Sequence, residues 1–145
     1  MMNEESNITQ YRLDDIRPGL TKNFKIKVTE SMMEEFAKLT GDYSPIHMEE
    51  AYARSTNFGR RICHGMLVGS FFSRLIGMHL PGKYGLLLSY SLRHLLPCFL
   101  DQEIKVEGRV VDKSSATRII TVSASVTDSF GKIIINGSLK VLVRE

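Results

Sequence analysis

HGMLVGSFFSRLIGMH, residues 64–79, carries the strongest fold signal in the chain. Its apolar side chains cover almost the whole circumference of a helix, and a helix of that kind is normally buried. Glycine and serine residues among them let neighbouring elements approach closely. Pro81 and Gly82 end the helix. The apolar residues are Met66, Leu67, Val68, Phe71, Phe72, Leu75, Ile76 and Met78.

The residues after this helix predict β-strands. Segment 86–92 is one, and segments 103–111, 120–127 and 133–143 alternate apolar with polar residues. Residues 128–131 predict a hairpin turn between the last two strands. We therefore expect an α+β domain in which a twisted antiparallel sheet wraps around the buried helix.

The residues before the helix predict one more strand and two helices. Residues 23–28 alternate and predict the first strand. A helix is expected next, beginning at Thr29 or at Ser31, where the sequence fits a capping box, and ending at Gly41. A second, short helix is expected over about residues 48–56.

Composition and charge narrow the class of protein. The chain has 145 residues, 43% of them hydrophobic, and a formal net charge of +3. We expect a single domain over residues 1–145, with a polar lead-in at 1–17. The Lys and Arg residues are spread along the chain, which argues against a nucleic acid partner. The first ten residues do not resemble a signal peptide, and no stretch is long and apolar enough for a bilayer. With Cys63 and Cys98 far apart in sequence, we expect a cytoplasmic protein with free thiols and no membrane partner.

The segment GDYSPIH, residues 41–47, contains a candidate acid/base pair. Pro45 disfavours the helical conformation at Ser44, so the segment is expected to be a turn. Asp42 and His47 can converge across that turn and hold one water molecule between them. One group would accept a proton from the water while the other gives a proton to carbon. Capping and turn roles explain the same two residues, so the spacing alone leaves both interpretations open.

A second candidate feature is His64 and Gly65 at the head of the predicted buried helix. Free backbone N–H groups at a helix N-terminus can bind a partial negative charge, such as that on a carbonyl oxygen. Glycine lets a substrate approach the backbone closely. A packing role for Gly65 and a hydrogen-bonding role for His64 are the alternatives.

Taken together, these motifs resemble those of the MaoC-like (R)-specific enoyl-CoA hydratases. The resemblance covers roughly residues 18–143, nearly the whole chain. It is more specific than either motif alone and favours the catalytic interpretation of the acid/base pair. The matching stretches include FAKLTGDYSPIH at 36–47, HGML at 64–67, LPG at 80–82 and SLR at 91–93.

The resemblance implies a hot-dog fold and a homodimer or higher homo-oligomer. It also implies that Asp42 and His47 activate the water and that Gly65 polarises the thioester carbonyl. The expected reaction is reversible syn hydration of a trans-2-enoyl-CoA to an (R)-3-hydroxyacyl-CoA. The resemblance further implies that no metal or redox cofactor is needed, and that coenzyme A is part of the substrate.

The chain departs from the family pattern at three positions. Ser44 stands where the family usually has Asn, Tyr90 where it often has Gln, and Leu96 where it often has Arg. We expect Ser44 and Tyr90, together with His64 and Met66, to contact the substrate. Two alternatives stay open at this point. One is an acyl-CoA thioesterase, because one fold can host both activities. The other is an acyl-CoA-binding module without turnover.

Overall fold

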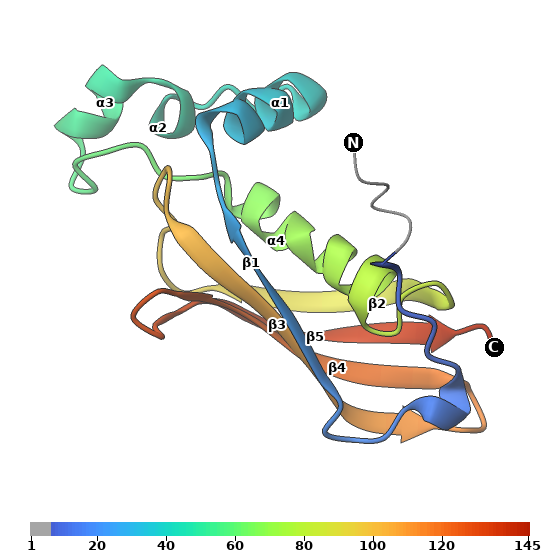
Figure 1. Cartoon of the computed structure of the whole chain (residues 1–145). Coiled ribbons are helices and arrows are strands. Elements are labelled where there is room, and N and C mark those ends of the chain that lie inside the picture. The colour runs from blue at the N-terminus through green and yellow to red at the C-terminus, as the bar shows by residue number, and fades with distance from the viewer. Residues whose placement is uncertain (1–6) are drawn as a thin grey trace.

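The helix predicted from residues 64–79 lies against one face of a curved antiparallel sheet (Figure 1). The computed structural model describes residues 7–145. The helix begins as α4, Gly65–Arg74, and continues in a wider π-helical turn, η3, Leu75–His79. The predicted arrangement of a sheet wrapped around one helix is confirmed.

The sheet has five strands in the order β1-β3-β4-β5-β2, and every neighbouring pair is antiparallel. Each predicted strand is present, and the structure extends most of them by a few residues. The predicted hairpin turn is also present, since the Asp128 side chain accepts hydrogen bonds from the N–H groups of Phe130 and Lys132. The strands are β1 Thr21–Lys27, β2 Gly85–His94, β3 Glu103–Ser114, β4 Ile119–Asp128 and β5 Ile133–Val143.

The first helix is α1, Glu30–Thr40, and its N-cap is Thr29. Thr29 Oγ1 accepts a hydrogen bond of 3.3 Å from the Met32 N–H. The predicted capping box at Ser31 is wrong, because Ser31 already lies inside the helix. Gly41, with φ of 82°, ends the helix as predicted, in the left-handed conformation that glycine adopts at little cost.

The second predicted helix forms earlier than expected and in two pieces. These are α2, Pro45–Met48, and α3, Glu50–Ser55, separated by an extended residue at Glu49. The start at 48 was wrong because proline, with its fixed φ and missing N–H, is well suited to the first turn of a helix. The three helices α1, α2 and α3 lie together beyond the N-terminal end of α4 (Figure 1).

The core lies between the sheet and the facing side of α4 and η3. Inward-facing residues of the sheet, such as Val106, Val122 and Leu139, are buried in the same core cluster as Leu75. Gly108 makes this close packing possible. A Cβ at that position would lie 2.7 Å from Leu75 Cδ2 and 2.9 Å from Val122 Cγ1. The absence of a side chain therefore lets η3 approach the sheet.

The expectation that this helix is buried on nearly all sides is wrong for the single chain. Leu67, Val68 and Phe72 face the sheet and are buried. Met66 is 72% exposed, and Ser70 and Ser73 on the same strip are exposed too. The sheet covers only one side of α4, so the opposite strip stays open.

Part of the predicted lead-in packs against the core. Residues 1–6 of that segment lie outside the described residues. Leu13 and Ile16 are buried, and Lys113 Nζ donates hydrogen bonds to their backbone carbonyls over 2.7 and 3.0 Å. Two apolar residues in so short a segment form no helical or strand pattern, so the sequence did not predict that they are buried. Within residues 7–145, none of the helices has the length and apolar character needed to span a bilayer.

Candidate active site

Asp42 lies in the tight turn between α1 and α2, and His47 lies inside α2. The Asp42 carboxylate is exposed, and its Oδ1 accepts a hydrogen bond of 3.1 Å from the Ser44 N–H. The Ser44 carbonyl in turn accepts the His47 N–H over 2.9 Å. These bonds fix the turn from within, as expected for an Asp followed by Ser-Pro.

His64 connects the two candidate catalytic residues. Its ring is 1% exposed, and Nε2–H donates a hydrogen bond of 3.0 Å to the Asp42 backbone carbonyl. The same ring packs against the His47 ring at a centroid distance of 4.3 Å, with Phe36 on it at 4.9 Å. The backbone of Asp42 and the ring of His47 therefore meet on one buried imidazole.

The His64 imidazole is neutral near pH 7. Burial lowers the pKa of His64 below its ordinary value of 6.5, and the neighbouring His47 acts in the same direction. Because Nε2 carries the proton, Nδ1 is an acceptor, and among the described residues it has no hydrogen-bond partner. A neutral ring can pack against His47 without charge repulsion.

The tautomer of His47 follows from its own partner. His47 Nδ1 lies 2.8 Å from the Ile62 backbone carbonyl oxygen. A carbonyl oxygen only accepts, so Nδ1 carries the proton. In the neutral ring the lone pair is then on Nε2. That nitrogen can accept a proton from water.

Two neighbouring cavities meet at the head of α4. The larger, about 730 Å³, is lined by Asp42 and His64, and the smaller, about 310 Å³, by His47. Gly65 and His94 line both cavities. The two candidate acid/base residues therefore line two cavities that share Gly65 and His94 as a border. The larger cavity runs in towards core residues, which include Phe72, Leu87 and Leu139.

Gly65 is the first residue of α4, so its N–H has no partner within the helix. A Cβ at this position would lie 3.1 Å from both Cε1 and Nδ1 of His94. The His94 ring therefore packs directly over Gly65, and a side chain there would displace it. Both the packing role and the carbonyl-binding role suggested by the sequence are compatible with this position.

The four other residues predicted to contact the substrate do not all line a cavity. Met66 and Tyr90 are exposed and line the larger cavity. Ser44 lines neither cavity and contributes its backbone to the turn. His64 lines the larger cavity with a ring that is almost fully buried.

Sequence reasoning identified no partner for His94, which borders both cavities, and did not connect Arg61 with His47, whose backbone carbonyl it contacts. No local spacing connects either residue to the GDYSPIH segment. Their positions follow from strand register and loop packing, for which the sequence offers no signal at such separations.

Cys63 precedes His64 but is not a candidate nucleophile. Cys63 and Cys98 are both buried free thiols. A hydrogen bond to Cys98, together with burial, raises the pKa of the Cys63 thiol. A protonated, buried thiol is a poor nucleophile.

A curved antiparallel sheet around one helix, with candidate acid/base residues near the head of that helix, defines a hot-dog domain with a candidate hydration site. The family model described as "MaoC like domain" matches residues 16–137. The chain belongs to this MaoC-like family, as the resemblance implied.

Individual relatives agree with this assignment. The (R)-specific enoyl-CoA hydratase of Aeromonas caviae is 37% identical over 106 residues, covering 73% of this chain and 79% of that protein. The (R)-specific enoyl-CoA hydratase of Rhodospirillum rubrum is 30% identical, covering 98% and 97%. The unliganded R-hydratase PhaJ1 from Pseudomonas aeruginosa superposes with a TM-score of 0.90 at 29% identity, covering 95% of this chain and 88% of that one.

Proposed function

We propose that this chain is a lyase that adds water reversibly to a trans-2-enoyl-CoA, giving an (R)-3-hydroxyacyl-CoA. The observation that carries the proposal is the convergence of Asp42 and His47 on His64, next to the free N-terminus of α4. The two relatives named as (R)-specific enoyl-CoA hydratases support the same reaction.

In the proposed mechanism His47 is the base. Its Nε2 lone pair accepts a proton from the water while the water oxygen bonds to C3. The π electrons of the C2–C3 bond move towards the thioester carbonyl. The hydrogen bond from Nδ1 to the Ile62 carbonyl stabilises the imidazolium that forms.

Asp42 completes the pair as a carboxylate: it takes up the proton of the His47 imidazolium through water and passes that proton to C2. This transfer returns both groups to their starting state. Water and the enoyl group are thereby consumed, and the hydroxyacyl group is the product. Positioned acid/base groups of this kind contribute about 10²–10⁴-fold in rate.

The N-terminus of α4 is suited to the charge that builds up on the thioester oxygen. In our proposal the Gly65 N–H donates to that oxygen, and the partial positive charge of the helix end adds to the effect. The larger cavity accommodates the acyl chain, since it extends towards Phe72 and Leu139 in the core. In our proposal, Met66 on the exposed strip of α4 and Tyr90 on β2 contact the acyl chain. We propose that no metal or redox cofactor takes part, because hydration involves no net oxidation or reduction and Asp42 and His47 carry the proton transfers.

We also propose that the protein forms a homodimer through β2. This strand ends the sheet, so within the described residues nothing pairs with its outer edge. It exposes Leu86, Leu88 and Tyr90, and an uncovered apolar edge strand favours pairing with another chain. Light scattering should give twice the mass of one chain, and a monomer at micromolar concentration would exclude this assembly.

A cytoplasmic location stays a prediction from the sequence.

The decisive assay follows crotonyl-CoA by the loss of the conjugated enoyl-thioester absorbance, with free thiol measured in parallel. A hydratase removes the absorbance without releasing thiol. Release of thiol would instead identify a thioesterase. Saturable binding with neither signal, repeated with longer enoyl chains, would identify a binding module without turnover.

A further inference from the structure

A buried guanidinium lies directly behind the proposed base. Arg61 is only 7% exposed. Its Nε donates a hydrogen bond of 2.6 Å to the His47 backbone carbonyl, and its Nη1 lies 2.8 Å from Glu30 Oε1. One side chain therefore joins the first turn of α1 to the residue that carries the base.

The next residue adds two further contacts to the same short segment. The Ile62 N–H donates to the Ile46 carbonyl over 3.3 Å, and the Ile62 carbonyl accepts His47 Nδ1–H over 2.8 Å. Arg61 and Ile62 together thus hold both the backbone and the ring of His47. We call Arg61, Ile62 and Glu30 the His47 clamp.

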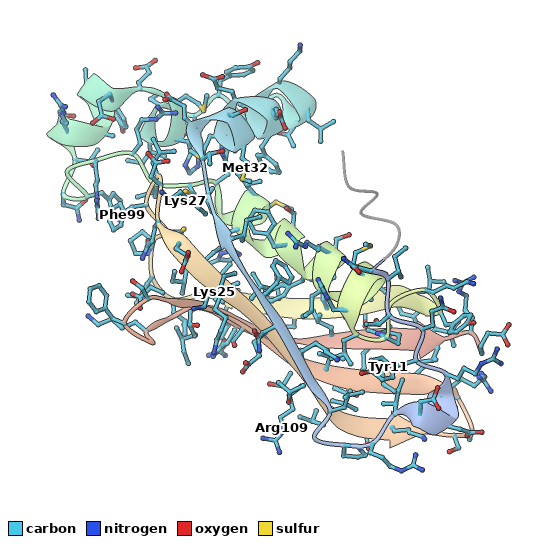
Figure 2. All side chains as sticks on the ribbon, in the orientation of Figure 1. Tyr11, Lys25, Lys27, Met32, Phe99 and Arg109 are labelled. Carbon is cyan, nitrogen blue, oxygen red and sulfur yellow. The ribbon has the colours of Figure 1, made fainter. Side chains whose placement is uncertain are left out.

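The clamp is itself fixed to the rest of the fold. Ile62 pairs with Phe99 in an isolated antiparallel bridge, and the Cys63 N–H donates to the Cys98 carbonyl over 2.7 Å. Figure 2 labels Phe99 in the loop between β2 and β3, near the end of the molecule that carries α2 and α3. The clamp therefore fixes His47 relative to the loop between β2 and β3.

The α2 helix needs such support because it has only four residues. A helix this short is not stable alone in water, since few hydrogen bonds offset the cost of ordering it. Contacts from outside the helix must therefore fix the direction of the His47 ring. A displacement of about 1 Å at a reacting group can cost about 10²-fold in rate.

We propose that Arg61 is a positioning residue for His47, with Glu30 orienting its guanidinium. The proposal rests on the hydratase function proposed above. Arg61 does not touch the substrate. It acts through the carbonyl of His47, so its removal should lower kcat far more than it changes KM. The expected loss in kcat for Arg61→Gln is about 10–100-fold, with KM within about threefold of the wild type.

The matched control is the Arg54–Glu50 pair on α3. Arg54 Nε lies 3.2 Å from Glu50 Oε1, and the two side chains are 73% and 50% exposed. It is the same kind of ion pair on a neighbouring helix, without a contact to His47. Arg54→Gln should leave both kinetic constants within about twofold, as expected for an exposed pair.

Two further variants keep the test decisive. Removal of a buried guanidinium can prevent folding, so Glu30→Gln, on the exposed side of the pair, is measured too and should lower kcat several-fold. Arg61→Lys keeps the charge but cannot span Glu30 and His47 together, so it should recover only part of the rate. Full recovery by Arg61→Lys would contradict the bridging geometry.

The closing experiment records the ¹⁵N NMR signals of the His47 ring in folded wild type, Arg61→Gln, Glu30→Gln and Arg54→Gln. Altered His47 signals in Arg61→Gln and Glu30→Gln, together with the expected loss of kcat, support the proposal. Unchanged signals and unchanged kcat in a folded Arg61→Gln overturn it. If Arg61→Gln does not fold, Glu30→Gln decides by the same two readouts. If the wild type lacks hydratase activity, the proposed function fails, while the ring signals still decide whether Arg61 positions His47.

Discussion

The core between α4 and the sheet differs from the segment 41–62 in what holds each in place. In the core, Val106, Val122 and Leu75 are fully buried and make apolar contacts. In the segment, Asp42 and Ser44 are exposed, and single hydrogen bonds set the geometry. Burial of apolar surface has no preferred direction, whereas a hydrogen bond fixes both distance and angle.

This difference separates stability from catalysis. The apolar core supplies most of the free energy of folding and gives the site a rigid support. The polar contacts of segment 41–62 add little to that free energy, but in the proposed mechanism they place the atoms that react. Substitutions in the core should therefore lower stability and spare kcat, whereas substitutions in segment 41–62 should lower kcat and spare stability.

The largest effect is expected for Asp42→Asn. The asparagine Oδ1 can still accept the Ser44 N–H, so the turn and the stability should be retained. Loss of the acid/base group should lower kcat by about 10²–10⁴-fold, or about 3–5 kcal/mol in transition-state free energy. The measurement is the crotonyl-CoA assay together with thermal unfolding.

Asp128→Asn is the control for this variant. Asp128 is also a carboxylate that accepts backbone N–H groups in a turn, but it lies in the β4–β5 hairpin. Its replacement should leave kcat unchanged. Full activity of Asp42→Asn would show that the assigned acid is wrong.

The second prediction is a loss of stability without a loss of kcat. Leu75→Ala removes a side chain with 0% exposure from the core and should lower the free energy of unfolding by about 2–5 kcal/mol. Because Leu75 lines neither cavity, kcat per folded molecule should stay within about twofold. Denaturant unfolding and the hydratase assay measure the two quantities.

The same substitution at an exposed leucine is the matched control. Leu39 on α1 is 84% exposed, so Leu39→Ala should change stability by less than about 0.5 kcal/mol. Equal losses of stability for the two variants would mean that the core described here does not dominate folding.

The smallest effect is expected from pH, through the buried His64. Its pKa is lowered in the folded state by burial, against an ordinary value of 6.5. Below pH 6.5 the unfolded chain therefore takes up a proton before the folded chain does, and stability falls as pH falls. Above pH 6.5 both states are neutral at this residue, and it has no effect on stability.

Urea midpoints at pH 7.5, 6.5 and 5.5 measure this effect in a window above the ordinary carboxylate pKa values of about 4. Burial also lowers the pKa of His79, which packs on Phe24, so the series is repeated with His79→Leu. The decline that remains in His79→Leu belongs to His64. A midpoint that stays constant from pH 7.5 to 5.5 in that variant would contradict a buried, neutral His64.

Much of the fold could be predicted because helices and strands follow patterns of apolar residues that repeat over only a few positions. The two-residue alternation of 120–127 and the apolar circumference of 64–79 each identify one element without reference to the rest of the chain. The helix ends were less certain. Thr29 and Ser31 competed as N-caps, and Pro45 could start a helix as well as interrupt one, because such alternatives differ by only about 1 kcal/mol.

The candidate site divides in the same way. The motif residues Asp42, His47 and Gly65 could be named from the sequence, since each belongs to a local pattern with a chemical reason. The open strip at Met66 could not be predicted, because an apolar circumference does not say which side the sheet covers.

The local order of residues was enough to specify the strands, the long helix and a set of candidate catalytic groups, because periodicity and turn chemistry act over a few neighbours. The meeting of Asp42 and His47 on His64, the contact of Arg61 with the His47 carbonyl and the packing of His94 over Gly65 join residues that are 14 to 29 positions apart. Such contacts depend on how whole elements pack, and packing distances are set by every side chain in between. For that reason, they became visible only once the chain was folded.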